Sequence, residues 1–355
     1  MTYFSLNTFF DNDLAGLFGQ FEDSRIRVSQ RLADEAEAAG ASQAQDEHEN
    51  DEGFRRGLGR QSDQVLVPAF IATYTGISPD LVDLDFISTV SALRYIPAPN
   101  WDINYNGLSK LAIFKDLFSS FSIKHGYKSV MRVNNFNSDP IYNNLLLEDD
   151  PAAIYGEREE QSLNYFSRLE IPQLTITEQF SPLIGIDVKT KTDMNLNFEY
   201  RKSRDLGMNF NGKELVHQST EEIVFGFGYT FENVDIPFLT RSGGSKKKKK
   251  PDGKADKILK LGGSGKVTNN RGQEMLVNVD FSFRDDVVWN FNVDGAQERT
   301  RGSQTIRVNP SVEYDVNQNL ALRLFFDYSK TVPVVNNSFP LTNAQGGVMT
   351  RFKLN

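Results

Sequence analysis

The sequence predicts an all-β fold of antiparallel strands that cross a membrane as part of an outer-membrane β-barrel, preceded by a partly helical or disordered N-terminal insertion. Three observations support this prediction. Apolar and polar residues alternate over segments that are long for a soluble sheet, the chain is rich in Phe and Tyr, and short turns alternate with longer loops between these segments. Outer-membrane barrels combine these three features.

The longest alternating segment, residues 184–210, is the strongest evidence for this fold. Its even-numbered positions are apolar, aromatic or Thr up to residue 200 and again from residue 206, whereas its odd positions up to residue 201 are charged, amide or Gly. Successive side chains of a strand point to opposite faces, so the pattern predicts a ribbon with one apolar and one polar face. A helical period of 3.6 would scatter the same residues around an axis. The step at 191–193 is read in two ways, as a tight turn between two strands or as part of one strand.

Composition fits a membrane barrel and excludes transmembrane helices and cysteine chemistry. The chain of 355 residues has a net charge of -8 and a mean hydropathy of -0.44. No run approaches the roughly 18 apolar residues of a transmembrane helix, and barrel strands have a low average hydropathy because their residues alternate. The 27 Phe and 12 Tyr are expected of a lipid-facing surface with aromatic girdles. Without cysteine there are no disulfides and no thiolate metal sites.

Residues 1–95 show no sustained alternation and are expected to form a mixed helical and disordered insertion or cap. Positions 21–37 fit a helix and 65–74 a short buried helix, while the Ala-rich and acidic stretch 33–52 predicts a disordered linker or frayed helix. Asp11 and Asp13 interrupt the apolar start, and no basic segment precedes it, so the N-terminus does not fit a signal peptide. Because a secreted barrel protein needs such a signal, we expect Met1 to lie inside a longer protein.

Residues 96–355 are expected to form barrel wall, with a flexible Lys- and Gly-rich loop at 241–266. Strand patterns begin at Trp101 and recur to the end of the chain. Short turns are expected at 211–213, 285–286 and 317–318, and longer loops at 294–302 and 330–342. If the C-terminal residue is periplasmic, counting these strands backwards puts the Lys-rich loop on the cell exterior.

The residues that could carry chemistry do not form a recognisable site. The three histidines, His48, His125 and His217, are far from any metal-ligand spacing, and no GxSxG motif supports a hydrolase that would use His125 or His217 as its base. Gly226 and Gly228 lack the strand-to-helix context of a phosphate loop. The five lysines at 246–250 fit a solvated loop better than a nucleic-acid site in an acidic chain. We therefore expect no enzyme activity, no metal, no cofactor and no nucleic-acid partner.

Several stretches resemble one family in order along the chain. They are 64–70 (QVLVPAF), 99–101 (PNW), 105–110 (YNGLSK), 180–185 (FSPLIG), 200–204 (YRKSR), 320–329 (LALRLFFDYS), 337–344 (NSFPLTNA) and 347–354 (GVMTRFKL). Together they resemble the C-terminal segment of the SprA/Sov family, the outer-membrane translocons of type IX secretion in Bacteroidota, which are also linked to gliding motility at the cell surface. Family members are several-fold longer and start with a signal peptide.

The resemblance implies that the chain is the last part of a very large barrel through which folded cargo proteins leave the cell. The implied partners are the remaining strands of the translocon, a PorV-type outer-membrane protein, a periplasmic plug protein, secreted cargo and the lipid bilayer. The N-terminal cap is expected to gate the pore. The polar parity is expected to line an aqueous lumen through Asp187, Lys189, Glu199, Arg201, Arg307, Glu313, Arg323 and Asp327.

The apolar alternation at the end of the chain predicts a terminal strand that the barrel-assembly machinery recognises. This strand carries Val348, Thr350, Phe352 and Leu354 on its apolar parity. Two alternatives remain open from the sequence. The first alternative is an independent small barrel of the porin or adhesin kind, and the second is a soluble β-rich binding domain.

Overall fold

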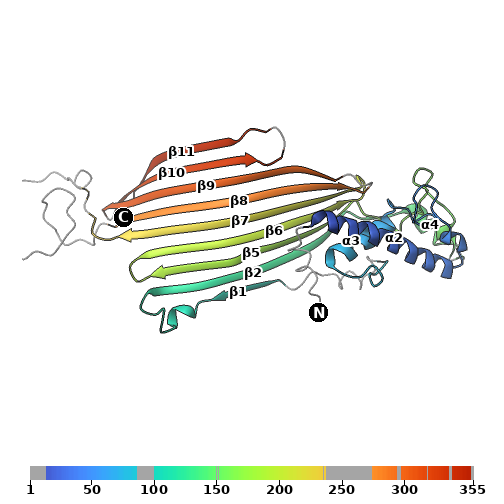
Figure 1. Cartoon of the computed structure of the whole chain (residues 1–355), viewed down its shortest axis with the longest axis horizontal. Helices are drawn as coiled ribbons and strands as arrows, with labels where there is room; N and C mark the ends of the chain where they lie inside the picture. Colours follow the sequence, from blue (N-terminus) through green and yellow to red (C-terminus); the bar gives the residue numbers. More distant parts are fainter. Residues whose placement is uncertain are drawn as a thin grey trace, which may run out of the picture.

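A long antiparallel sheet and a layer of helices at one end of it make up the fold (Figure 1). The computed structural model describes residues 13–85, 100–148, 150, 152–234, 236, 274–293, 297–317, 319–335 and 338–352. The helices are α2 (Leu14–Ala38), η1 (Ser42–Gln45), α3 (Asp63–Thr75), η3 (Leu108–Lys110), α4 (Pro140–Leu145) and η4 (Ala153–Tyr155). The strands are β1 (Trp101–Tyr105), β2 (Phe118–Asn134), β3 (Asn137–Ser138), β4 (Leu169–Glu170), β5 (Gln173–Thr190), β6 (Met194–Asn209), β7 (Glu214–Phe231), β8 (Met275–Asn292), β9 (Gln297–Asn317), β10 (Leu320–Pro333) and β11 (Leu341–Phe352).

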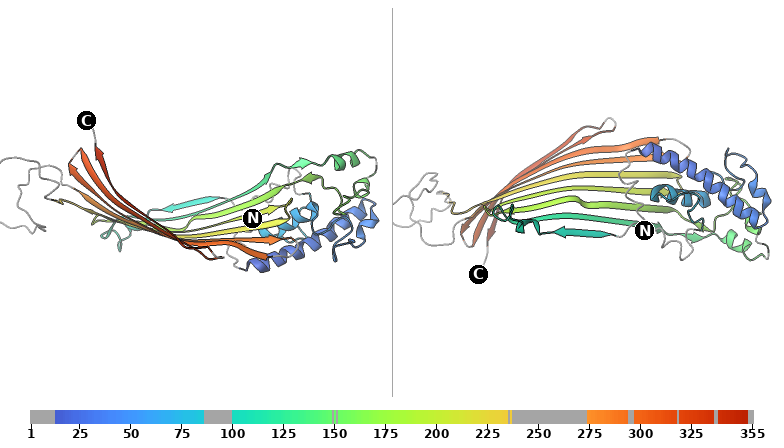
Figure 2. Two further views of the ribbon diagram at one scale, coloured as in Figure 1. Left: turned by 90° about the horizontal axis from the view of Figure 1, so that it is seen from above. Right: turned by 60° about the horizontal axis from the view of Figure 1, so that its bottom comes forward.

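The main sheet contains nine strands in the order β1-β2-β5-β6-β7-β8-β9-β10-β11, and every neighbouring pair is antiparallel. The small β3–β4 pair and α4 lie in the connection between β2 and β5. Among the described residues β1 and β11 each pair with one neighbour only, so the sheet is open at both edges. Figure 2 shows the strong twist of the sheet along its length. The predicted fold class was an all-β fold of antiparallel transmembrane strands that form part of a large outer-membrane barrel. The predominantly antiparallel sheet is confirmed, and its place in a membrane barrel stays a prediction.

The register aligns one parity of every strand on one face. A single cross-strand row passes through Tyr105, Ile123, Ile186, Phe198, Phe225, Phe281, Val308, Tyr328 and Ala344, one from each of the nine strands. Directly paired residues share a face of a sheet. In this row and the rows between it and the β9–β10 turn, the alternation seen in the sequence therefore places mainly apolar side chains on one face and polar side chains on the other.

Tight turns join several of the strands. Residues 191–193 form the turn between β5 and β6, and residues 210–213 form the one between β6 and β7. Asp193 (φ 58°) and Lys213 (φ 50°) take the left-handed backbone conformation in these turns. The first of the two readings of step 191–193 is thus correct.

The expected turn at 285–286 is wrong, because both residues lie inside β8. Asp285 and Asp286 pair with Glu221 and Thr220 of β7, and β8 continues unbroken to Asn292. The expected loop at 294–302 is also too long, since β9 begins at Gln297. The charged pair was mistaken for a turn because it interrupts the apolar parity, not because it interrupts the strand.

With residues 285–286 inside β8, the backward count of strands that gave the expected side of the Lys-rich loop loses one strand. The loop residues 241–266 lie outside the described residues, but Phe231 and Met275, which flank the loop, pair with each other at one end of the sheet. Met275 also pairs with Tyr314, which lies at the β9–β10 turn end, where Leu320 pairs with Phe352. Phe231 and Met275 therefore lie at the end of the sheet where the described part of β11 finishes at Phe352.

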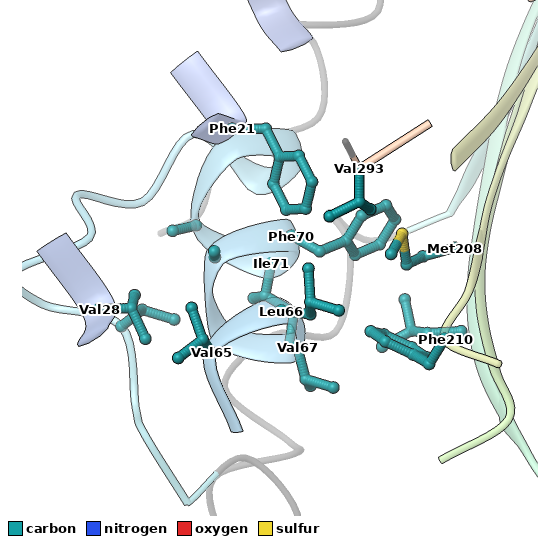
Figure 3. Close-up of a cluster of buried hydrophobic side chains, with 14 of the residues drawn as sticks. Phe21, Val28, Val65, Leu66, Val67, Phe70, Ile71, Met208, Phe210 and Val293 are labelled. Carbon is teal, nitrogen blue, oxygen red and sulfur yellow. The ribbon is translucent and has the colours of Figure 1, made fainter. Parts of the chain in front are cut away.

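A helical layer packs on the far end of the strands (Figures 1 and 2). Helix α2 begins at the N-cap Asp13, whose side chain accepts a hydrogen bond from the Gly16 amide, and α3 ends at Gly76 in the left-handed conformation (φ 72°). Nearly every residue of α3 is buried, because α3 lies between α2 and the sheet. Figure 3 shows its apolar side chains directed at Met208, Phe210 and Val293 of the strand ends. The predicted buried helix at 65–74 is confirmed.

The expectation of a disordered linker or frayed helix at 33–52 is wrong. Helix α2 runs to Ala38, and η1 follows it directly. Ala33, Ala36, Ala41 and Ala44 are all buried, since small side chains let α2 and η1 approach each other closely. Burial of these alanines against a partner supplies the apolar area that the isolated stretch lacks.

Candidate membrane-spanning surface

One face of the sheet carries a continuous band of apolar side chains, which we call the apolar band. On β7 it comprises the odd positions of residues 223–231, and on β8 the odd positions of residues 275–283. Large members of the band are exposed, among them Ile184, Ile223, Phe225, Phe231, Phe281, Ile306, Leu324, Phe326, Val348 and Phe352. Exposed apolar surface of this extent on a monomer marks an interaction with lipid or protein.

The height of the apolar band matches a bilayer. Residues 223–231 span about 27 Å along the strand at about 3.4 Å per residue. A tilted transmembrane strand needs roughly 9–11 residues, and the apolar belt of an outer-membrane barrel is about 25 Å tall. The strands themselves are longer than this, with 18 residues in β7 and 18 in β8. The sheet therefore continues well beyond the apolar band.

Aromatic side chains border the apolar band at both ends. Toward the helical layer, Trp101 stacks on Tyr127 with ring centroids 4.6 Å apart, and Phe180 lies 4.9 Å from Tyr127. Toward the C-terminal end, Tyr229 meets Phe231 at 4.5 Å. Such girdles lie at the level of lipid headgroups in known barrels, because an aromatic ring combines apolar area with a polar group or edge.

The opposite face carries the charged residues that the sequence assigned to a lumen. The register puts all of them on one face, Asp187, Lys189, Glu199, Arg201, Arg307, Glu313, Arg323 and Asp327. Lys124 forms an ion pair with Asp187 at 2.5 Å, and Arg201 pairs with Glu222 at 3.2 Å and with Glu199. On the last strands, Arg351 pairs with Glu313 at 3.2 Å, and Gln345 donates a hydrogen bond to Asp327 at 3.0 Å. The Lys124–Asp187, Arg201–Glu222 and Gln345–Asp327 contacts join adjacent strands, and the Arg351–Glu313 pair joins β11 to β9 across β10.

A belt of ionisable side chains interrupts the apolar face just beyond the apolar band. Lys202, Glu221 and Asp285 follow one another in register on β6, β7 and β8, and Glu178 and Arg204 lie opposite each other in the next row. Lys202 pairs with Glu221 at 2.9 Å. Glu178 accepts hydrogen bonds from the Tyr127 hydroxyl at 2.8 Å and from the Arg204 guanidinium, and its side chain is fully buried. We call these five residues the charged belt.

Sequence reasoning missed the charged belt, although a signal was present. Its residues occupy the apolar parity of four consecutive strands of the sheet, so each looks like a local break in alternation. Only the register aligns the breaks into one line. Beyond that line the apolar parity resumes in Ile176, Leu206, Leu215 and Phe291, which the helical layer covers. The helices thus pack on the face that carries the apolar band.

Where the helical layer meets the sheet, Lys213 anchors α3 through two contacts. Its ammonium forms an ion pair with Asp63 at 2.9 Å and donates a hydrogen bond to the Gln61 carbonyl at 2.9 Å. Burial raises the pKa of the Asp63 carboxyl above its ordinary value of 3.8, and the Lys213 ammonium opposes this shift. Burial therefore disfavours the charged form of the Asp63 carboxyl, and the neighbouring Lys213 ammonium favours it.

The predicted terminal strand is β11. Val348 and Phe352 pair with Leu324 and Leu320 of β10, and Thr350 pairs with Leu322. These side chains share the face of the apolar band, and Val348 and Phe352 are 66% and 68% exposed. Leu354 lies outside the described residues. The recognition of this strand by an assembly factor stays a prediction.

Searches for a metal-binding cluster and a membrane-spanning helix among the described residues, and for a matching family model and a matching curated sequence, were all negative. The described part of the chain holds no cluster of three or more His, Asp or Glu side chains that could bind a metal ion. In that same part, no helix is long and apolar enough to cross a membrane. No protein-family model matches the chain, and no curated protein sequence matches it.

Proposed function

We propose that the chain is a wall segment of an outer-membrane β-barrel. The observation that carries this proposal is the apolar band, which crosses all nine strands at one height. The polar face, the aromatic borders and the bilayer-like height support it. Since neither edge strand has a second neighbour among the described residues, further strands are needed before the wall can stand in lipid.

The particular barrel that we propose is the type IX secretion translocon of the SprA/Sov kind, which passes folded cargo proteins across the outer membrane. The sequence resemblance and the open nine-stranded sheet support this assignment. In this proposal the charged polar face lines the pore. The remaining strands of the translocon, a PorV-type protein and a periplasmic plug complete the assembly.

The position of the helical layer changes one part of this picture. Phe18 of α2 stacks on Phe291 of β8 with ring centroids 4.9 Å apart, and Phe291 shares the face of the apolar band. In the proposed orientation the helices therefore lie outside the wall, on the lipid-facing side above the membrane. They are an external support of the strand ends and not the gate of the pore.

Each alternative function meets a structural objection. An independent small porin or adhesin would need its first and last strands to pair, and the described β1 and β11 do not. A soluble binding domain would leave Phe225, Phe281 and Leu324 in water at 43%, 37% and 54% exposure across an uncovered face. Neither alternative has an observation of its own that favours it.

Adjacent residues of β8 provide the test. Phe281 lies in the middle of the apolar band, whereas Ser282 lies on the polar face. In the complete protein, Phe281→Arg should impair insertion into the outer membrane, since an arginine at the bilayer midplane costs about 2–4 kcal/mol on the lipid face of a barrel. Ser282→Arg, the matched control, should insert normally. Membrane fractionation, carbonate extraction and heat-modifiable gel mobility measure the outcome.

Cargo secretion in the same strains would connect insertion to transport. The Ser282→Arg strain should secrete a cargo protein, and the Phe281→Arg strain should not. If Phe281→Arg inserts as well as Ser282→Arg, the apolar band does not face lipid and the proposal is wrong. If both variants insert poorly, the polar face does not meet water. A third outcome separates the barrel from the translocon. If Ser282→Arg inserts normally but deletion of the gene leaves cargo export unchanged, the chain is a barrel segment and the translocon assignment is wrong.

A further inference from the structure

The connection between β1 and β2 exposes more apolar surface than a solvated loop does. We call residues 106–117 the β1–β2 connector. Leu111, Ile113 and Leu117 are exposed by 47%, 78% and 59%. They lie beside Tyr105 and Ile123, exposed members of the apolar band on the two flanking strands. The connector thus extends the apolar surface beyond the end of the sheet.

The connector has a defined conformation despite this exposure. It begins with η3 and continues in helical turns, with hydrogen bonds from the Phe114 and Lys115 amides to the Leu111 carbonyl and from the Phe118 amide to the Phe114 carbonyl. The Lys191 amide of the β5–β6 turn donates a hydrogen bond to the Leu117 carbonyl at 3.1 Å. The connector is therefore tied to the neighbouring turn.

An aromatic cluster fixes the side of the sheet on which the connector lies. Phe114 packs edge-on against Phe121 with ring centroids 5.6 Å apart, and Phe118 packs against the same ring at 5.4 Å. Phe121 pairs with Val188 on the face of the apolar band. The connector consequently folds toward the lipid-facing side, at the height where the apolar band ends. A further strand pairing with β1 would extend the sheet in its own plane and would leave this face uncovered.

Two exposed lysines complete an interfacial pattern. Lys110 and Lys115 are exposed and lie among the apolar residues of the connector. Lysine side chains can extend from an apolar surface to place their ammonium groups among lipid phosphates. Amphipathic helices that combine lysine with large apolar side chains lie in the plane of the membrane interface, and the turns of the connector present the same combination.

We propose that the β1–β2 connector lies in the headgroup layer of the leaflet at the β11-terminal end of the wall and binds glycerophospholipids. Leu111, Ile113 and Leu117 insert among the upper acyl carbons, and Lys110 and Lys115 bind headgroup phosphates. The connector then holds the β1 edge of the sheet at a fixed depth in the membrane. This inference rests on the proposed membrane orientation.

The absence of cysteine from the chain makes a direct test available. Single cysteines at Ile113→Cys, Val279→Cys and Asn309→Cys in the complete protein are labelled with an environment-sensitive fluorophore. The protein is reconstituted in phosphatidylethanolamine and phosphatidylglycerol vesicles that contain lipids with a nitroxide near the headgroup or deep in the acyl chain. Val279 reports on the middle of the apolar band, and Asn309 on the polar face.

The expected result is an emission shift to shorter wavelength at position 113, with stronger quenching by the shallow nitroxide than by the deep one. Position 279 should show the opposite order, and position 309 should not be quenched. Quenching at 279 without quenching at 113 would overturn the connector proposal and leave the proposed function intact. A blue-shifted but unquenched probe at 113 would mean that protein covers the connector. No quenching at either position would reject the membrane orientation itself.

The lysines are tested in the same assay. Lys110→Glu with Lys115→Glu in the Ile113→Cys protein should reduce the shallow quenching, while the probe at 279 should be unaffected. Unchanged quenching at 113 would overturn the assignment of the lysines to headgroup phosphates.

Discussion

Glu178 of β5 and Arg204 of β6 lie opposite each other and form a buried ion pair on the same sheet face as the apolar band. The Tyr127 hydroxyl donates a hydrogen bond to the other carboxylate oxygen of Glu178. Their row separates the surface that we assign to lipid from the surface that the helical layer covers. Both charges of this pair are desolvated, so removal of either partner would leave the other charge buried without compensation.

Glu178→Ala should therefore destabilise the protein strongly. Removing one partner of a buried pair costs about 3–5 kcal/mol. The control is Asp85→Ala, since Asp85 and Arg168 are 53% and 55% exposed in their ion pair, which contributes at most about 1 kcal/mol. Urea titration followed by tryptophan fluorescence compares the two. Equal shifts for both variants would mean that the Glu178 pair is no more buried than an exposed one.

Phe291→Ala should loosen the helical layer without affecting the apolar band. Phe291 is 2% exposed and stacks on Phe18, and truncation of a buried Phe costs about 3–5 kcal/mol. Phe283→Ala, on the same strand and face but within the apolar band, is the control. Limited proteolysis should cut α2 faster in Phe291→Ala alone, with membrane insertion retained in both. Faster cleavage in both variants would show that the band and the helical layer are not separate packing units.

Two glycines should respond in opposite directions to an added methyl group. A Cβ at Gly59 would lie 2.6 Å from Asp51 Oδ2, 2.9 Å from His48 Nε2 and 3.0 Å from Asn164 Oδ1, so Gly59→Ala should be destabilising. A Cβ at Gly19 meets no atom within 4 Å, and this residue lies inside α2. Gly19→Ala should stabilise the protein by about 0.5–1 kcal/mol. Thermal melting measures both, and a lower melting temperature for Gly19→Ala would contradict the described packing of α2.

Asp63 should make the helical layer less stable as the pH rises. Burial raises the pKa of Asp63 in the folded protein, so its contribution to stability is complete below the ordinary value of 3.8 and is lost as the pH rises through the folded value. Asp63→Asn should remove this dependence, so the unfolding free energy of Asp63→Asn should rise relative to that of the unchanged protein as the pH increases from 3.8 through the folded pKa of Asp63. Urea titrations across this range measure the difference. If instead the unfolding free energy of the unchanged protein rises relative to that of Asp63→Asn as the pH increases, the Lys213 ammonium has a larger effect on the pKa of Asp63 than burial has.

The sequence predicted the sheet well because its evidence is local. Each strand shows its own alternation, and the turns at Asp193 and Lys213 follow from short polar breaks. The helical layer was only partly predictable, since Ala33 and Ala36 look unfit for a core until η1 and α3 supply the surface that covers them. Likewise, Asp285 resembles a turn residue until the register aligns it with Glu221 and Lys202.

The helical layer covers β2 and β5–β8 at one end of the wall, and among the side chains that the structure describes its core takes none from β9–β11. In the proposed orientation this asymmetry sets lateral spacing in a crowded membrane. A neighbouring barrel can approach β9–β11 until only lipid separates the two walls, whereas the overhanging helices hold it away from β5–β8. The wall therefore has one side open to close neighbours and one side that excludes them, without any contact surface dedicated to that purpose.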